Sequence, residues 1–392
     1  MATQRIVVLG AGYGGILAAV RAARKTRGRA SVLLIDASDR LVERIRLHQR
    51  AAGQVVTSHA LAEITAGSGV TLRQGRISAI RPSERVVVVD DELVPYDHLV
   101  IALGSATDRK AVPGLEHVHT LDGRSAGLLG EALPGLAAKG AHVLVCGGGL
   151  TGIEAASELA EVRPALKVTL VTAGGLGDEL SRAAARHLRR WFDAHGVTVI
   201  EHAPVVAVEP EQALLRGRTI AFDACVWAGG FAASPLGRAA GLAVNERGQV
   251  VVDAMLRSVS HPDIYAVGDA AAPPPTGSTL MMSCKTAMPM GAQAADNLAA
   301  RVHGHAEAPF GFGDTGCCIS LGRSDGIIQL ATRTGVPRKR IITGRLGAWL
   351  KERVCRYPVF SLRLEARGLL HYRWLPPVRA ALQAREVNRL AS

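Results

Sequence analysis

Apolar runs that break into glycines and continue as amphipathic stretches form the clearest pattern in this chain. The first run covers residues 5–9 and leads through glycines into ILAAVRAARKT, a stretch with helical periodicity. The same order of apolar run, glycines and amphipathic stretch returns at residues 141–161. This order predicts a strand, a tight turn and a helix, which begin a βαβ unit. Because the unit occurs twice, we expect an α/β chain with two similar parallel sheets.

The glycines of each unit stand at the fixed positions of G-x-G-x-x-G. The first glycine permits a tight turn, the second lets the backbone approach a pyrophosphate, and the third lets the helix pack close to the strand. The helix then offers its first N–H groups to the phosphates. The pattern predicts two Rossmann-like dinucleotide-binding domains, the alternative being glycine-rich turns without a ligand. The residues expected at the turns are Gly10, Ala11, Gly12, Tyr13, Gly14 and Gly15 in the first unit, and Gly147, Gly149 and Gly152 in the second.

The two units differ at the end of their second strand. The first ends in Asp36, whose carboxylate can accept both hydroxyl groups of a ribose, whereas the second ends in Thr172 and Ala173. A carboxylate there would favour NADH and repel the 2′-phosphate of NADPH, so the preference between them stays open. Arg182 and Arg186 either face such a phosphate or lie on a solvated helix.

Between and after the two units, the pattern predicts shorter elements. Arg44 lies in the first of these elements, a helical segment over 37–66, either on a solvated face or beside a bound cofactor. Two further glycine turns follow apolar strands at Gly104 and Gly229, and a short strand precedes Gly268 and Asp269. The expected elements are a helical segment over 37–66, an antiparallel meander over 69–95, a linker over 105–140, a helix over 291–302 and two antiparallel strands within 310–330.

The composition favours a globular protein and gives little support to nucleic-acid binding. Of the 392 residues, 48% are hydrophobic but only 4% are aromatic, which leaves few rings to stack on bases. No apolar run approaches the roughly 18 residues that span a bilayer, and the first strand begins too early for a signal peptide. The six cysteines form no C-x-x-C pair. We therefore expect buried cysteines, no metal site and a cytoplasmic location.

The basic charge is concentrated at the end of the chain. The net charge is +12, and residues 338–392 hold thirteen Lys and Arg but only three acidic residues. Within 345–382, apolar positions recur at helical spacing with basic residues between them, which is typical of a helix lying in a membrane interface. Such a helix would place the protein on the inner face of the cell membrane. The alternative is that this segment packs on its own domain or on a second copy in a homodimer, with Pro358 breaking any long helix.

Several motifs together resemble the flavoproteins with two dinucleotide folds, the pyridine nucleotide-disulfide oxidoreductase superfamily. These are the two glycine motifs with ALGS at 102–105, WAGG at 227–230 and YAVGDAA at 265–271. Within it, the chain resembles type II NADH dehydrogenases and AIF-like quinone reductases, and it lacks the redox cysteine pair of the disulfide reductases. The resemblance implies an FAD-binding domain over 1–110 and 245–310, an NAD(P)H-binding domain over 111–244, and a C-terminal α+β interface domain over 311–392.

The resemblance also implies roles for individual residues. The first glycine motif and Asp36 would hold the ADP half of FAD, Ile77 would meet the adenine, and Gly268 with Asp269 would hold the ribityl and phosphate region. The second motif would hold the pyrophosphate of NAD(P)H. The remaining cofactor contacts expected are Ala37, Arg44, Ala102, Gly104, Thr172, Gly229 and Ala292.

Three residues match positions near the reacting groups in the family. Glu154 matches an acid near the nicotinamide and flavin, although an acid early in a helix is also favoured by the helix dipole. Lys285 matches a lysine near the flavin, its alternative being a surface lysine. Gln293 matches the first glutamine of the quinone-side motif A-Q-x-A-x-Q, whose last position is Asn297 here. Met288 and Met290 are candidates for the lining of an apolar quinone slot.

The sequence thus predicts an FAD-dependent NAD(P)H oxidoreductase that passes hydride from nicotinamide to flavin and electrons to a quinone or quinone-like acceptor. One alternative is a flavin reductase of a soluble aromatic metabolite. The other is a non-enzymatic redox or interaction flavoprotein of the AIF type.

Overall fold

The computed structural model describes residues 3–275 and 280–377, and it contains two five-stranded parallel sheets. The first has the order β21-β9-β1-β2-β5, and all four neighbouring pairs are parallel. Its central strand is fully apolar and buried from Ile6 to Leu9. Strand bounds are β1 (Gln4–Leu9), β2 (Ala30–Asp36), β5 (Val70–Gln74), β9 (His98–Ile101) and β21 (Ile264–Ala266).

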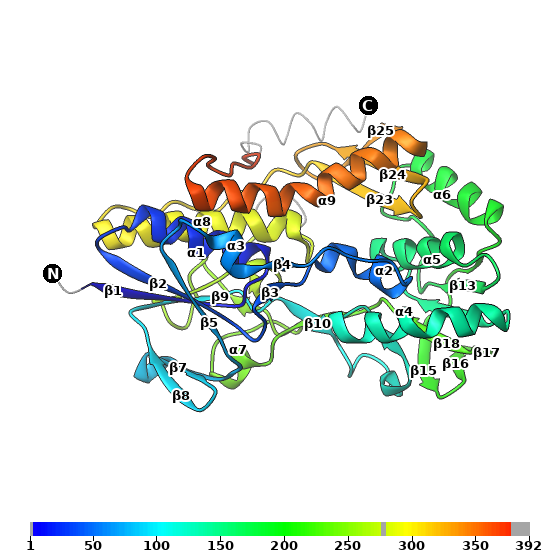
Figure 1. The fold of residues 1–392 in the computed structure, drawn as a ribbon, viewed down its shortest axis with the longest axis horizontal. Helices are drawn as coiled ribbons and strands as arrows, with labels where there is room; N and C mark the ends of the chain where they lie inside the picture. The colour runs from blue at the N-terminus through cyan, green and yellow to red at the C-terminus, as the bar shows by residue number, and fades with distance from the viewer. Residues whose placement is uncertain (1–2, 276–279, 378–392) are drawn as a thin grey trace.

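The second sheet repeats this architecture with the order β11-β18-β12-β13-β14. It lies beside the first sheet, at the right of Figure 1, and has a separate apolar core. Its strands are β11 (His119–Thr120), β12 (His142–Cys146), β13 (Lys167–Val171), β14 (Thr198–Ile200) and β18 (Ala224–Trp227). The helices that pack on the two sheets are α1 (Tyr13–Lys25) and α8 (Cys284–His303) on the first, and α4 (Gly123–Ala138), α5 (Leu150–Val162) and α6 (Arg182–Ala194) on the second. The predicted α/β class with two Rossmann-like sheets is confirmed.

Each half also carries a three-stranded antiparallel sheet, and a short ladder joins the halves. The two small sheets are β6 (Ile77–Arg81), β7 (Val86–Val89) and β8 (Glu92–Pro95), and β15 (Val205–Glu209), β16 (Gln212–Leu215) and β17 (Arg218–Ala221). The ladder pairs β10 (Ser105–Thr107) with β19 (Phe231–Ala233), the strands that follow the glycine turns at Gly104 and Gly230. It therefore connects equivalent points of the two halves.

The C-terminal part is an antiparallel sheet followed by one long helix. The sheet consists of β23 (Gly316–Leu321), β24 (Asp325–Ala331) and β25 (Pro337–Ile342), and the helix is α9 (Gly344–Arg367). Helix α9 packs on β24 and on α1, so it extends along the upper side of both halves in Figure 1. The expected C-terminal α+β region is confirmed, with a third strand added, while the exact domain limits stay a prediction.

The expected helical segment over 37–66 is wrong as a continuous element. It contains the short helices α2 (Leu47–Ala51) and α3 (Leu61–Thr65), the turn η1 (Arg44–Arg46) and the two-stranded ladder of β3 (Arg40–Leu41) and β4 (His59–Ala60). Gly53 in the left-handed conformation ends α2, and the chain then runs extended to β4.

Two further expectations about the strands and the linker are corrected. Residues 70–74, expected in the meander, form β5 and extend the parallel sheet, because their partner is β2. Residues 105–140 are not a linker: β11 joins the second sheet, and α4 buries Ala126, Leu129 and Leu133 in its core.

The helix expected over 291–302 begins seven residues earlier, at Cys284. Gly291 and Pro289 were expected outside or at the start of the helix, yet both lie inside it. A Cβ atom at Gly291 would overlap the carbonyl oxygen of Gly14, so this glycine permits the close crossing of α1 and α8. In the same way, α9 continues through Pro358, although proline has no N–H to donate to the carbonyl of Val354 one turn earlier.

The remaining short elements complete the connections. They are α7 (Leu236–Ala239), the ladder of β20 (Val250–Val251) with β22 (Ala271–Ala272), and the 3-10 turns η2 (Pro82–Glu84), η3 (Leu115–His117) and η4 (Gly268–Ala270).

Replacing Gly291 with Ala should destabilise the protein by about 1–3 kcal/mol, because the added methyl group forces α1 and α8 apart. The matched control is Gly135→Ala in α4, where an added Cβ meets nothing among the described residues, so helix propensity should stabilise the fold slightly. Denaturant unfolding followed by circular dichroism measures both. Equal stability of the two variants would contradict the crossing argument.

Candidate functional site

The two glycine loops have the same backbone geometry. The N–H of Gly10 donates to the carbonyl of Ile35 at 2.8 Å, and the N–H of Gly147 donates to that of Val171 at the same distance. Gly10 (φ +97°) and Gly147 (φ +127°) both have positive φ, which strongly favours glycine. The loops are therefore equivalent in structure as well as in sequence.

Packing accounts for the first and third glycine of each motif. A Cβ at Gly10 would lie 2.5 Å from the carbonyl oxygen of Ala102. Gly15 and Gly152 lie so close to the carbonyl oxygens of Gly10 and Gly147 that any Cβ would overlap them. These contacts bring each helix against its strand, as the motif predicts.

The second glycine of each motif has a different explanation. A Cβ at Gly12 or Gly149 would meet no atom of the described residues within 4 Å. Both residues are N-caps in extended conformation, and no side chain of the described residues caps either helix. The first N–H groups of α1 and α5 therefore face open space, where a diphosphate fits both the shape and the partial positive charge. This fits two dinucleotides, one at each loop.

The ribose acid of the first unit lies beside its glycine loop. Asp36 accepts hydrogen bonds from the backbone of Ala11 (2.6 Å) and Ser38 (2.9 Å). Strand pairing places Thr172 at the equivalent position of the second unit, since Leu9 pairs with Ile35 and Cys146 with Val171. The second loop thus presents a hydroxyl group where the first presents a carboxylate.

The adenosine end of the first site brings together residues that the sequence predicted separately. The N–H of Gly75 donates to the carbonyl of Asp36 (2.8 Å), and the side chain of Gln74 donates to the carbonyl of Ala37 (3.2 Å). Ile77 follows directly at the start of β6, where the pairing with β7 is irregular. The contact of Ile77 with an adenine stays a prediction.

At the other end of the first loop, a polar chain joins three more of the predicted regions. Arg44 donates to the carbonyl of Ser105, next to Gly104, and the hydroxyl of Ser105 donates to Asp269 at 2.7 Å. Gly268 packs against Ala287 in the first turn of α8. Arg44 is exposed, yet its guanidinium is bonded to Ser105 beside Gly104, and its place next to a bound cofactor stays a prediction.

Other predicted contacts are backbone positions around the two loops. The N–H of Ala102 donates to the carbonyl of Leu9, Gly229 packs on the indole of Trp227, and Ala292 is buried inside α8. Tyr13 is buried, and its hydroxyl makes no hydrogen bond with the described residues. Burial raises the pKa of Tyr13, and the nearby Glu43 raises it further.

Glu154 is buried and ionised between three elements. Its carboxylate accepts hydrogen bonds from the backbone of Ser320 (3.0 Å) and from the ammonium of Lys351 (2.9 Å). Burial opposes its ionisation, but Lys351 and the nearby His48 outweigh that effect and lower the pKa of Glu154. Burial alone would lower the pKa of Lys351, yet Glu154 raises it. The two side chains form a buried ion pair.

Sequence reasoning missed the buried role of Lys351. By the sequence pattern it is one of the basic residues that alternate with apolar positions within 345–382, whereas in the structure it belongs to the buried stripe of α9. The signal was its four-residue spacing from two small residues of this stripe, Gly347 and Cys355.

Lys285 and Gln293, the other two predicted reactive residues, are held by neighbouring groups. Lys285 pairs with Asp314 (2.7 Å) and donates to the carbonyl of Gly316 (2.9 Å). The side chain of Gln293 donates to Asn297 at 3.0 Å. The roles of Lys285 near the flavin and of Gln293 toward a quinone stay predictions.

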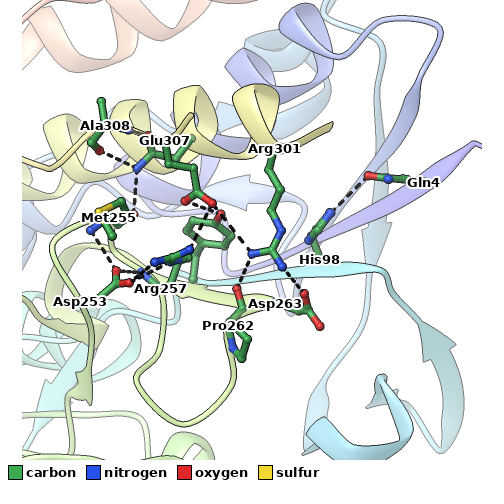
Figure 2. Close-up of polar contacts among 12 residues, drawn as sticks. Gln4, His98, Asp253, Met255, Arg257, Pro262, Asp263, Arg301, Glu307 and Ala308 are labelled. Atoms are coloured by element: carbon green, nitrogen blue, oxygen red, sulfur yellow. Dashed lines mark hydrogen bonds and ion pairs between the residues drawn. The ribbon is translucent and has the colours of Figure 1, made fainter. Parts of the chain in front are cut away.

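Asn297 anchors α8 to two loops of the first half. Its side chain donates to the carbonyl groups of Met255 (2.9 Å) and Ala308 (3.0 Å). Figure 2 labels Met255 and Ala308 beside a cluster of ion pairs around Glu307. In that cluster, Glu307 accepts the hydroxyl of Tyr265 at 2.9 Å and faces Arg257 at 3.5 Å. These contacts explain Asn297 as a structural residue of the loop packing.

A cavity of about 1250 Å³ lies between α9, the segment that precedes β4, and the turn between β23 and β24. Met288 and Met290, expected to line an acceptor slot, are instead buried in the core of the first sheet. The cavity is lined by apolar and charged side chains, among them Val55, Trp349, Phe360, Arg46, Arg323 and Arg356. It could admit a molecule with an apolar body.

The described residues contain neither a membrane-spanning helix nor a cluster of metal ligands. Within residues 3–275 and 280–377, no helix is both long and apolar enough to cross a membrane. In the same part of the chain, no three His, Cys, Asp or Glu side chains are arranged to hold a metal ion.

The chain resembles known proteins over most of its length. The family model described as pyridine nucleotide-disulphide oxidoreductase matches residues 4–291. An NADH dehydrogenase-like protein of Mycobacterium tuberculosis is 31% identical over 322 residues, which cover 75% of this chain and 80% of that protein. A type II NADH:quinone oxidoreductase of Staphylococcus haemolyticus is 25% identical over 397 residues, covering 92% and 96%. The solved sulfide:quinone oxidoreductase of Aquifex aeolicus shares the fold, with a TM-score of 0.79, 20% identity and coverage of 96% and 100%.

Replacing Gly12 or Gly149 with valine should block binding of one dinucleotide each without disturbing the fold. Gly12→Val should abolish binding of the first dinucleotide, and Gly149→Val that of the second, because each side chain fills the space at a helix N-terminus. Bound flavin measured by absorbance and nicotinamide binding measured by calorimetry separate the two effects. Unchanged binding in both variants, with unchanged thermal stability, would contradict the assignment of these loops.

Proposed function

Because this chain belongs to the pyridine nucleotide-disulphide oxidoreductase family, we propose that it is an FAD-dependent NADH dehydrogenase that delivers electrons to a quinone. The observation that carries the proposal is the pair of equivalent glycine loops, whose second glycines leave open space at two helix N-termini. The names of two relatives, NADH dehydrogenase-like protein and type II NADH:quinone oxidoreductase, support both the donor and the acceptor.

The residues of this chain would mainly hold and align the reactants. FAD, when bound, supplies the ring that accepts a hydride from the nicotinamide and passes electrons on. The N-termini of α1 and α5 would hold the two diphosphates, and Asp36 the ribose of FAD. Arg44 and Asp269, linked through Ser105, would fix the flavin half of the cofactor. Alignment of this kind contributes much of the rate in hydride transfer.

Lys351 and Glu154 would provide the charge and the proton that the acceptor needs. Lys351 donates to the carbonyl of Cys318 as well as to Glu154, and its charge also acts on Cys284 at the start of α8. A cation at this place would stabilise negative charge that develops on a quinone oxygen. Lys285 and Gln293 are proposed to support the flavin and quinone from α8.

The second loop bears on the choice of nicotinamide nucleotide. The relatives named above point to NADH, but Thr172 offers no carboxylate to repel the 2′-phosphate of NADPH. We therefore propose NADH as the main donor, with NADPH discriminated less strongly than by an enzyme that has an acid at this position.

The acceptor would enter through the cavity beside α9. Val55, Trp349 and Phe360 give it an apolar lining, while Arg323 and Arg356 remain in contact with water and Arg46 is buried. An aromatic ring with an apolar tail matches such a lining. Because the cavity lies along α9, the same helix would guide the acceptor from a membrane surface.

The exposed face of α9 suits contact with an anionic membrane. Apolar side chains lie on it at Leu346, Trp349, Tyr357 and Phe360, each about half exposed, and Arg353 stands midway between Trp349 and Tyr357. Arginines accompany them, and the guanidinium of Arg353 lies over the ring of Trp349 at 5.2 Å. Apolar insertion plus basic charge is the usual basis of peripheral membrane binding. The part of the tail beyond residue 377 lies outside the described residues.

The experiment that tests the proposed function is anaerobic reduction of the purified protein. We expect bound flavin, bleaching of its absorbance by NADH, and return of the absorbance when a soluble quinone is added. NADPH in place of NADH tests the donor. A protein that is colourless and takes up no added flavin would refute the proposal.

Charge reversal on the exposed face of α9 should weaken membrane binding. Arg353→Glu combined with Val354→Glu should lower binding to phosphatidylglycerol vesicles about tenfold or more, since each basic residue contributes about 1 kcal/mol near an anionic surface. Cosedimentation measures this, with zwitterionic vesicles as the control. Unchanged vesicle binding together with a smaller size in gel filtration would show instead that this face joins two copies.

A further inference from the structure

His48 lies in a buried position between two glutamates of α5. Its side chain is 2% exposed, with Nδ1 3.6 Å from Glu154 and Nε2 3.7 Å from Glu158. The Nε2 atom makes no hydrogen bond within the part of the chain that the structure describes. A buried imidazole with an acid at each nitrogen has the geometry of a group that passes protons.

The two glutamates beside His48 bond to different parts of the structure. On one side, Glu154 pairs with Lys351 at 2.9 Å, and Lys351 also donates to the carbonyl of Cys318. On the other side, Glu158 accepts hydrogen bonds from Gln54 and pairs with Arg323. Gln54 and Arg323 both line the cavity beside α9. Four titratable side chains, Glu158, His48, Glu154 and Lys351, therefore follow one another behind Gln54 and Arg323 of the cavity wall, with the two glutamates 3.6–3.7 Å from the imidazole nitrogens.

The proposed function, on which this inference rests, needs such a row. NADH and a quinone react with one proton to give NAD⁺ and the quinol. The hydride brings two electrons and one hydrogen, so the second hydrogen of the quinol must come from water through the protein. Lys351 is buried, and it must be reprotonated after each turnover.

We propose that His48 relays this proton from Glu158 to Glu154, so that Lys351 can donate a proton to the reduced acceptor. The N–H bond of Lys351 breaks as the O–H bond of the quinol forms. A proton then moves from Nδ1 of His48 through Glu154 to the amine, while Nε2 takes one from Glu158. Glu158 regains a proton from water of the cavity, and a turn of the imidazole ring that exchanges Nδ1 and Nε2 restores the first tautomer.

The pKa directions of His48 and Glu158 agree with this direction of transfer, whereas the ion pair with Glu154 raises the pKa of Lys351 and so opposes release of its proton. Burial lowers the pKa of His48 to about 4, with Glu154 opposing and Lys351, Arg323 and Arg46 assisting. The imidazole is thus neutral near pH 7, with one N–H and one free lone pair. Burial raises the pKa of Glu158 despite the nearby Arg323, which favours a proton on that side. Helix α4, which also packs on α2, contributes Leu129 and Leu133 to the surrounding core.

The test compares a quinone with ferricyanide as acceptors of electrons from NADH. Ferricyanide takes up electrons without protons, so its reduction should not need the relay. For His48→Gln, we expect kcat with a soluble quinone to fall by about 10²-fold, at the lower end of proton-transfer effects, with an increased solvent isotope effect. Reduction of ferricyanide should stay within about twofold of the wild type, since that step bypasses the proton transfer.

A matched control and a rescue experiment separate the relay from a structural role. His98 is also buried and its pKa is also lowered by burial, but its partner is Gln4, and both lie on strands of the first sheet (Figure 2). His98→Gln should leave the ratio of quinone to ferricyanide activity unchanged. In His48→Ala, added imidazole should restore quinone reduction at least several-fold.

A readout without turnover is the pH dependence of thermal stability. Because the folded-state pKa of His48 is lowered from 6.5 to about 4, its contribution to stability is present above pH 6.5 and is lost as the pH falls toward 4. His48→Gln should remove this component. Equal losses with both acceptors, or normal quinone reduction by His48→Gln, would overturn the relay. If the wild type reduces neither acceptor, the proposed function itself fails.

Discussion

A buried ion pair between Lys351 and Glu154 holds the C-terminal helix against the second glycine unit. Charges inside a protein are stable only when their partners are close and their remaining hydrogen-bonding capacity is used. Here the backbone N–H of Ser320 and the carbonyl of Cys318 complete the pair. Since Glu154 follows the second glycine loop and Lys351 lies on α9, the pair fixes the covering helix to the loop beneath it.

The parts of the fold that sequence alone predicted are those fixed by local geometry. The strand–glycine–helix units are confirmed because their glycines are required by contacts and backbone angles within a few residues. Examples are the positive φ of Gly10 and the contact of Gly15 with the preceding turn. The same local signal located both candidate dinucleotide loops. Asp36 and Thr172 could be placed for the same reason, since each ends the strand next to its loop.

The parts that sequence could not predict depend on contacts between distant segments. The sequence pattern predicted a helix start at Gly291. The structure shows instead that glycine is needed there because α8 crosses α1 at Gly14, far away in the chain. Lys351 suggested a solvated face, yet packing of α9 buries it beside Glu154. His48 stood in a stretch expected to be one charged helix, and only the tertiary structure shows that it lies between two acids of α5. Local patterns carry no information on such pairings.

The order of strands in the first sheet has a consequence for synthesis on the ribosome. Strand β21, which forms one edge of that sheet, and α8, which crosses α1, are both encoded after the whole second sheet. The second sheet is thus the first to have all of its strands outside the exit tunnel. Until β21 and α8 have been synthesised, the amino-terminal strands have one unpaired edge and α1 is uncovered. We therefore expect the nascent chain to need protection from aggregation before these two elements emerge.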